Sequence, residues 1–208
     1  MSQFLQIHPD NPQPRLIKQA VEVVRKGGVI VYPTDSAYAL GCHVGDKSAL
    51  DQIRRIRRVS DRHNFTLVCR DLSEIAVYAK VDNSAYRSLN AHTPGAYTFI
   101  LEATREVPRR LMHPKRRTIG IRVPDNRVAQ ALLEELGEPL MSSTLLLPEH
   151  DMPLTDAEDV RDLLEHQVDL IIDGGNCGIE PTTVVDMSEH TSVIIRRGKG
   201  DPSPFDLD

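Results

Sequence analysis

Apolar positions along the chain alternate between helical spacing and short continuous runs. Residues 13–26 predict an amphipathic helix, because their apolar side chains recur on one helical face. The run at 29–32 is rich in β-branched residues and too short for a helix, so it predicts a buried strand. Gly27 and Gly28 separate the two segments, and glycine readily adopts the left-handed conformation that ends a helix.

The same patterns predict elements over most of the chain. Further helices are expected after an Asp46 cap, at 71–79, at 83–91, at 126–136 and from a capping box of Thr155 and Glu158. Further strands are expected at 65–69, 97–101, 118–123, 140–142, 170–172, 183–186 and 193–196, with an edge strand within 1–11. This alternation is typical of the α/β class, here a twisted open mixed sheet flanked by helices. We expect a single domain over 1–208, with its core at about 13–198 and a loose acidic tail at 199–208.

A polar turn follows the strand predicted at 29–32. Pro33 cannot donate to a β-ladder, so the strand should stop there. Thr34, Asp35 and Ser36 then place two hydroxyls and a carboxylate just past the carboxyl end of the strand. Open α/β sheets bind ligands at this edge, so we expect Thr34 to line the main cavity. An ordinary turn that caps a strand would have the same pattern.

Basic side chains gather in two clusters, although the formal net charge of −5 argues against non-specific nucleic-acid binding. The first cluster consists of Arg54, Arg55, Arg57, Arg58 and Arg62, and the second of Arg105, Arg109, Arg110, Lys115, Arg116 and Arg117. An acidic protein with local basic patches suits an anionic ligand, either a phosphate or an RNA backbone. The first cluster would equally fit a solvated helix end, where the dipole stabilises cations.

Composition excludes several classes of protein. Hydrophobic residues make up 40% of the 208 residues, which is enough for a core. No apolar run approaches the roughly 20 residues of a membrane span, and the N-terminus lacks the features of a signal peptide. The three cysteines are far apart and fit reduced thiols. We therefore expect a cytoplasmic protein without membrane contact, as a monomer or weak dimer.

Familiar motifs for phosphate and metal chemistry are missing from the sequence. It contains no glycine-rich phosphate loop, dinucleotide fingerprint or nucleophile elbow. The histidines show no metal-ligand spacing with the cysteines, so we expect no tightly bound metal. A phosphate site would therefore be built from scattered arginines, hydroxyls and backbone donors.

Five short motifs, taken in order, resemble those of the YrdC-like family. They are GGVIVYPTD at 27–35, TPGAYTF at 93–99, IGIRVP at 119–124, PTTVVD at 181–186 and RRG at 196–198. Each is weak alone, but five in the right order are specific, and the resemblance runs from about Arg15 to Gly198. Within that family the chain most resembles the YciO branch.

The resemblance implies both a chemistry and a set of contacts. Synthases of this family condense threonine, bicarbonate and ATP into threonylcarbamoyl-AMP, which starts a modification of tRNA adenosine. By position, the nucleotide and its phosphates would meet Arg55, Arg57, Arg122, Ser142, Thr144 and Arg196. Thr34 and Tyr38 would contact the amino-acid substrate, and Arg54, Arg58 and Arg62 would contact RNA. ATP or AMP is the implied ligand, with Mg²⁺ accompanying ATP.

Two departures from the synthase pattern bear on activity. Arg55 and Arg57 stand approximately where synthases carry K-x-R, with Asn64 near the end of that element, and arginine is a planar fork rather than a compact ammonium. The synthase S-T-S-A-N element reads SSTLL at 142–146, so Leu146 replaces an asparagine. Leucine cannot form the hydrogen bonds of an asparagine amide, so we expect weak or missing synthesis.

Three interpretations of the resemblance remain open. The protein is an enzyme with synthase activity or a related activity, such as hydrolysis of threonylcarbamoyl-AMP. Alternatively, it binds double-stranded RNA or tRNA through arginine patches, without nucleotide chemistry. The third interpretation is a diverged relative that binds a nucleotide and performs no reaction. Tight nucleotide binding with turnover would favour an enzyme, whereas salt-dependent binding of duplex RNA would favour an RNA-binding protein.

Overall fold

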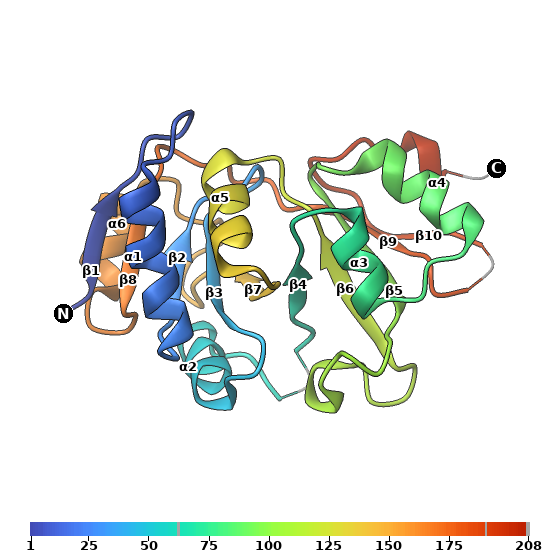
Figure 1. The fold of residues 1–208 in the computed structure, drawn as a ribbon, viewed down its shortest axis with the longest axis horizontal. Coiled ribbons are helices and arrows are strands. Elements are labelled where there is room, and N and C mark those ends of the chain that lie inside the picture. The colour runs from blue at the N-terminus through green and yellow to red at the C-terminus, as the bar shows by residue number, and fades with distance from the viewer. Residues whose placement is uncertain (62, 190, 207–208) are drawn as a thin grey trace.

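Ten strands form one twisted mixed sheet in a computed structural model that describes residues 1–61, 63–189 and 191–206 (Figure 1). The strand order is β1-β8-β2-β3-β7-β4-β6-β5-β9-β10. The strands are β1 (Gln3–Gln6), β2 (Ile30–Tyr32), β3 (Ala39–His43), β4 (Thr66–Val68), β5 (Tyr97–Glu102), β6 (Thr118–Arg122), β7 (Leu140–Thr144), β8 (Leu170–Asp173), β9 (Thr183–Asp186) and β10 (Val193–Arg196). The helices are α1 (Pro14–Arg25), α2 (Lys47–Arg57), α3 (Leu72–Tyr78), α4 (Asn83–His92), α5 (Arg127–Leu136) and α6 (Ala157–Leu164). The expected α/β fold is confirmed.

Strand β2 is an inner strand, as predicted. It pairs in parallel with β8 and antiparallel with β3. Ile30 and Tyr32 belong to the apolar cluster under α1 and α5, whereas Val31 belongs to the cluster on the opposite face. A strand covered on both faces explains the uninterrupted apolar run in the sequence.

Local signals in the sequence set most helix ends. Asp46 caps α2 by accepting from the backbone N–H of Ala49 at 2.9 Å, and Gly27, at φ +84°, follows α1. The capping box predicted at Thr155 is wrong by one residue. Asp156 caps α6 and accepts from the backbone N–H of Glu158 at 2.7 Å.

Helices cover the sheet unequally. Helices α1 and α5 pack on the face of the sheet that carries Tyr32, Val68 and Leu140 (Figure 1). The opposite face is covered by α2, α3, α4 and α6, whose apolar side chains form one continuous cluster with it. Side chains alternate along a strand, so Ser142 and Thr66 share the face of Leu140 and Val68. The part of that face that α5 does not cover carries Ser142 and Thr66, which line a cavity.

The segment after residue 198 packs more closely than expected. A loose tail was predicted for 199–208, but Phe205 is buried at 4% exposure. Its ring contacts Tyr97 and Phe99 of β5 at centroid distances of 5.9 and 6.0 Å, and the ring of His92 at 4.8 Å. The sequence did not reveal that Phe205 is buried, because one aromatic residue among acids and prolines gives no periodic signal.

Among the described residues, no helix is long and apolar enough to cross a membrane.

Candidate functional site

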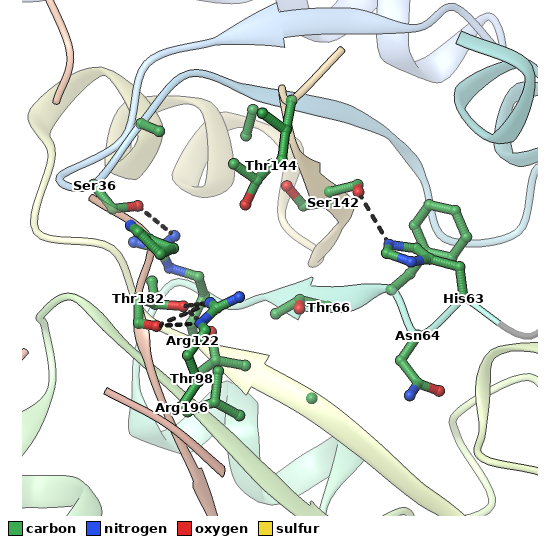
Figure 2. Close-up of a pocket in the computed structure, with 18 of the residues that line it drawn as sticks. Ser36, His63, Asn64, Thr66, Thr98, Arg122, Ser142, Thr144, Thr182 and Arg196 are labelled. Carbon is green, nitrogen blue, oxygen red and sulfur yellow. Dashed lines mark hydrogen bonds between the residues drawn. The ribbon is translucent and has the colours of Figure 1, made fainter. Parts of the chain in front are cut away.

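A pocket of about 640 Å³ opens on the face of the sheet that α5 leaves uncovered. Its floor is a row of residues in register across four strands. Ser142 on β7 pairs with Thr66 on β4, Thr66 pairs with Gly120 on β6, and Gly120 pairs with Ile100 on β5. A Cβ on Gly120 would come within 3.3 Å of Thr98 and 3.4 Å of Thr66, so the glycine keeps the floor open. Figure 2 shows Arg122 and Arg196 toward one end of this pocket, His63 toward the other, and hydroxyl side chains between them.

Arg122 extends from the end of β6 into the pocket wall and is only 7% exposed. Its Nη1 donates to Ser36 Oγ at 3.2 Å, and its Nη2 donates to the carboxylate of Asp35. The same carboxylate accepts from the backbone N–H of Asp125 at 3.0 Å. The Arg122 Nε–H is buried without a partner among the described residues. A buried donor left unpaired is costly.

Arg196, on the end strand β10, lines the same pocket, and Figure 2 shows it toward the same end as Arg122. Its Nε and Nη2 donate to the backbone carbonyl of Thr182 at 3.0 and 2.9 Å, and Nη2 also donates to Thr182 Oγ1 at 3.1 Å. That hydroxyl is 2.9 Å from Thr98 Oγ1. The motif around Thr182 therefore fixes the orientation of the Arg196 guanidinium.

Arg57, the last residue of α2, forms the other basic end of the pocket. Its Nη1 donates to Ser143 Oγ at 2.5 Å and lies 3.1 Å from His63 Nε2, while its Nε donates to the backbone carbonyl of Leu146 at 3.3 Å. Ser143 Oγ is also 3.4 Å from His63 Nε2. Burial lowers the pKa of Arg57, but an arginine stays protonated at neutral pH.

A further arginine closes the side of the pocket formed by the β5–β6 connection. Arg116 Nη2 donates to the Asp186 carboxylate at 2.5 Å and to Ser188 Oγ at 2.7 Å. Burial alone would raise the pKa of Asp186, but hydrogen bonds from Ser188 and Arg116 outweigh it and hold the pKa below its usual value. Arg116 is thus already paired, unlike the Nε of Arg122.

Six of the residues predicted for the site line this pocket. They are Thr34, Arg57, Arg122, Ser142, Thr144 and Arg196. Like the three arginines, two of the hydroxyl side chains are held by other polar groups. Thr34 Oγ1 donates to the carbonyl of Ala37 at 2.5 Å, and Ser142 Oγ is 2.7 Å from the Tyr32 hydroxyl. Their arrangement around one cavity agrees with the predicted convergence, and their binding roles remain predictions.

Arg55 does not reach the pocket, contrary to the sequence prediction. Its side chain is exposed and is absent from the pocket lining. Successive helical residues are about 100° apart, so Arg55 and Arg57 point about 200° apart around α2. Only one of the two can face the pocket, and Arg57 is that residue.

Tyr38 is likewise excluded from the pocket. Its ring is fully buried in the core, and its hydroxyl donates to the carbonyl of Gly175 at 2.6 Å. Burial is the largest cause of the strongly raised pKa of this hydroxyl. Alternation along an extended chain explains the placement, because Ala37 and Ala39 face the pocket and Tyr38 faces the other way.

The arginines assigned to RNA have other contacts. Arg54 Nη1 donates to Asp51 at 3.0 Å, and its guanidinium lies 5.5 Å from the centre of the Phe65 ring. Arg58 is exposed and pairs with Glu149 at 3.1 Å. Arg62 lies outside the described residues. RNA contact by these side chains therefore stays a prediction.

Several lining residues were not predicted as site residues. His63, Thr66, Thr98, Ser143 and Thr182 all line the pocket. His63 was not singled out from the sequence, because the histidines show no metal-ligand spacing. The threonines gave a usable signal, since a polar residue inside a predicted strand indicates a face that is not packed against a helix. Strand order and register were needed to bring them together.

Among the described residues, no group of three or more His, Cys, Asp or Glu side chains could hold a metal ion.

The chain is similar to one family of proteins over most of its length. The family model for Sua5, YciO and YrdC proteins, described as "Telomere recombination", matches residues 22–198. The "Uncharacterized protein YciO" of Escherichia coli strain K12 is 62% identical over 205 residues, which covers 99% of this chain and 100% of that protein. A "Threonylcarbamoyl-AMP synthase" of Coxiella burnetii strain RSA 493 is 30% identical over 159 residues, covering 76% of this chain and 84% of that protein.

Solved structures give the same picture of the fold. The crystal structure of E. coli YciO superposes with a TM-score of 0.95 at 61% identity, covering 99% of this chain and 100% of that one. The crystal structure of P. abyssi Sua5 complexed with L-threonine superposes with a TM-score of 0.86 at 23% identity. That match covers 94% of this chain and 57% of the Sua5 chain, and at this identity it bears on the fold alone.

Proposed function

The chain belongs to the Sua5/YciO/YrdC family, and on that premise we propose that its basic pocket binds an adenine nucleotide. The family relation to threonylcarbamoyl-AMP synthases supports the choice of an adenine nucleotide. The phosphates would meet Arg57, Arg122 and Arg196, and the hydroxyls of Ser142 and Thr144 would contact the nucleotide. Arg55 and Tyr38 have no part in this proposal.

One observation carries the proposal. Three guanidinium groups, from α2, β6 and β10, line a single cavity although they come from distant parts of the chain, with Arg122 and Arg196 toward one end and Arg57 at the other. Asp35 already pairs with Arg122, but Arg57 and Arg196 form no ion pair among the described residues, so their positive charge favours a ligand with negative charge.

Synthesis of threonylcarbamoyl-AMP would be weak in this pocket. The reaction requires the carboxylate and the α-phosphate to be aligned to a fraction of an ångström. Leu146 lines the pocket at the position of a synthase asparagine and offers no side-chain donor or acceptor there. A related reaction in the same pocket, such as hydrolysis of threonylcarbamoyl-AMP, would use water as its second substrate in place of an aligned carboxylate.

Magnesium would enter with ATP rather than occupy a site of its own. Mg²⁺ prefers oxygen ligands and is commonly bound by one or two carboxylates together with substrate phosphates. Asp151 is the carboxylate of the pocket lining, while Asp35 is already paired with Arg122. The triphosphate and water would therefore supply most of the ligands of the ion.

Calorimetry and a product assay test the proposal. We expect AMP, and ATP in the presence of Mg²⁺, to bind with micromolar dissociation constants, because a few charge-assisted hydrogen bonds suffice for that affinity. Pyrophosphate release with threonine and bicarbonate should be far below that of a synthase such as the C. burnetii enzyme. Failure of both nucleotides to bind would contradict the proposal.

RNA binding is a second candidate function, supported by the β5–β6 connection. This segment carries exposed basic side chains next to the pocket residues His113 and Arg116. The exposed side chains are Arg105, Arg109, Arg110, Lys115 and Arg117. A-form RNA is bound mostly through its phosphates and 2′-hydroxyls, for which such side chains are suited. Affinity for duplex RNA or tRNA that falls steeply with salt would support this function.

A further inference from the structure

The contact between Arg57 and His63 favours the neutral form of the histidine. Arginine has no acceptor, so a guanidinium N–H directed at His63 Nε2 requires that nitrogen to carry a lone pair. His63 is therefore neutral, with its ring proton on Nδ1. Ser143 Oγ lies 3.4 Å from the same nitrogen, so two groups of the pocket converge on it.

The charged groups around His63 are arginines. Helix α2 contributes Arg57 and Arg54, strand β7 contributes the uncharged Ser143 hydroxyl, and the ring of Phe65 packs edge-on at 5.2 Å. Among the described residues, no carboxylate forms an ion pair with His63. Burial first, then the charges of Arg57 and Arg54, hold the pKa of His63 below its usual value.

An anion bound at Arg57 would reverse this balance. Phosphate oxygens at the guanidinium would bring negative charge next to the His63 ring, which favours the protonated imidazole. The same oxygens would compete with His63 Nε2 for the Nη1–H of Arg57. Once Nε2 is released from Arg57, it is able to take a proton and donate to the anion.

We infer that His63 is an anion-binding residue of this pocket that takes up a proton when a phosphate-bearing ligand binds at Arg57. The inference rests on the proposed function for the position of the phosphates. The proton comes from solvent and is added to Nε2, so neutral imidazole becomes imidazolium and no other bond changes. Arg57 keeps its hydrogen bonds to Ser143 Oγ and to the carbonyl of Leu146, which hold the guanidinium in place.

The inference can be tested without a nucleotide. Inorganic pyrophosphate is titrated calorimetrically into the full-length protein in buffers of different ionisation enthalpy, and the slope of the observed heat gives the number of protons taken up. His63→Gln retains an acceptor near Nε2 but does not titrate. His166→Gln removes an exposed histidine outside the pocket lining as a control. Protonation of pyrophosphate itself cancels when the variants are compared with the unmodified protein.

We expect proton uptake to be smaller in His63→Gln by about half a proton or more at a pH between the pKa values of free and ligand-bound His63, and unchanged in His166→Gln. The affinity advantage of the unmodified protein over His63→Gln should grow as the pH falls from 8 and should approach tenfold once the pH is below the pKa of His63 in the free protein, since raising the pKa of His63 by about 1 on binding corresponds to a tenfold gain in affinity for the protonated form. Equal uptake in the unmodified protein and His63→Gln, or no binding of pyrophosphate, would overturn the inference.

A spectroscopic measurement covers the case in which the variant does not fold. In the unmodified protein with pyrophosphate present, the NMR signal of the His63 ring Cε1–H should titrate at a pH that is higher by about 1 or more. An unchanged titration midpoint would overturn the inference. The proposed function is separable, because pyrophosphate could bind with proton uptake while AMP and ATP fail to bind.

Discussion

Arg122 and Asp35 form an ion pair that joins the end of β6 to the loop after β2. The Nη2 of Arg122 donates to Asp35 Oδ1, and the two side chains are only 9% and 11% exposed. The same loop carries Ser36, which also accepts from Arg122, and the other carboxylate oxygen of Asp35 accepts from the backbone N–H of Asp125. Asp35 is thus the counterion of a pocket arginine rather than a group that contacts the ligand.

Replacing Asp35 should therefore destabilise the fold. Removing one partner of a buried ion pair leaves an uncompensated charge, so Asp35→Ala should lower the free energy of unfolding by about 3 kcal/mol. The exposed pair of Arg58 and Glu149, with side chains 70% and 77% exposed, is a matched control. Glu149→Ala should cost about 0.5 kcal/mol or less. Urea denaturation measures both, and similar losses in the two variants would contradict the assignment of a buried pair.

The two arginines at the end of α2 should differ in their effect on nucleotide binding. Arg57 lines the pocket, whereas Arg55 is exposed on another side of the helix. A charge-assisted hydrogen bond is worth about 1.5–3 kcal/mol, so Arg57→Gln should weaken AMP binding roughly 10- to 100-fold. Arg55→Gln should leave the dissociation constant within about twofold of the unmodified protein. Calorimetric titration with AMP distinguishes the two, and loss of affinity in Arg55→Gln alone would show that the pocket is wrongly placed.

Gly198 should be intolerant of any side chain. A Cβ at this position would lie 2.2 Å from the carbonyl oxygen of Pro181 and 2.7 Å from the backbone of Thr182. Because these neighbours are backbone atoms, the two segments would have to separate. Gly198→Ala should therefore lower the free energy of unfolding by about 1–3 kcal/mol, and it should also weaken AMP binding, since Thr182 orients Arg196. Thermal unfolding and calorimetry test the two effects.

The close approach at Gly198 also brings two distant motifs of the sequence into contact. The motif at 181–186 and the motif at 196–198 contact each other through this glycine and through Arg196. If Gly198→Ala leaves both stability and AMP affinity unchanged, the close approach of these segments is not needed for the site.

The sequence was sufficient for elements whose signal is local. The run before Pro33 predicts β2, and Asp46 predicts the start of α2, because each depends on a few neighbouring residues. The resemblance to the YrdC-like family, and within it to the YciO branch, is confirmed by the matches reported above. Strand β3 was not predicted, since it contains Gly41, a residue that is rare in strands. A Cβ on Gly41 would lie 2.8 Å from the ring of Tyr32, and that contact can be seen only in the folded protein.

The candidate site was predictable to the extent that it depends on sequence motifs. Arg122, Arg196 and Thr34 follow from motifs, and they line the pocket as expected. Arg55 and Tyr38 were misplaced because a motif gives the position along the chain and not the direction of the side chain. The role of His63 depends on its distance to Arg57 and Ser143, which α2 and β7 bring together only in three dimensions.

Leu146 should limit synthesis of threonylcarbamoyl-AMP in this pocket. Its side chain lines the cavity, and its carbonyl accepts from Arg57, so the backbone here is already fixed. Leu146→Asn adds two donors and an acceptor without moving that backbone. Pyrophosphate release with ATP, threonine and bicarbonate should rise about tenfold or more, since a group that aligns reacting atoms is worth at least that much. Leu146→Ala enlarges the pocket without adding a polar group and should not raise the rate. If both variants respond alike, space rather than hydrogen bonding limits the reaction. If the unmodified protein already matches a synthase in this assay, the leucine is harmless and the proposed loss of activity is wrong.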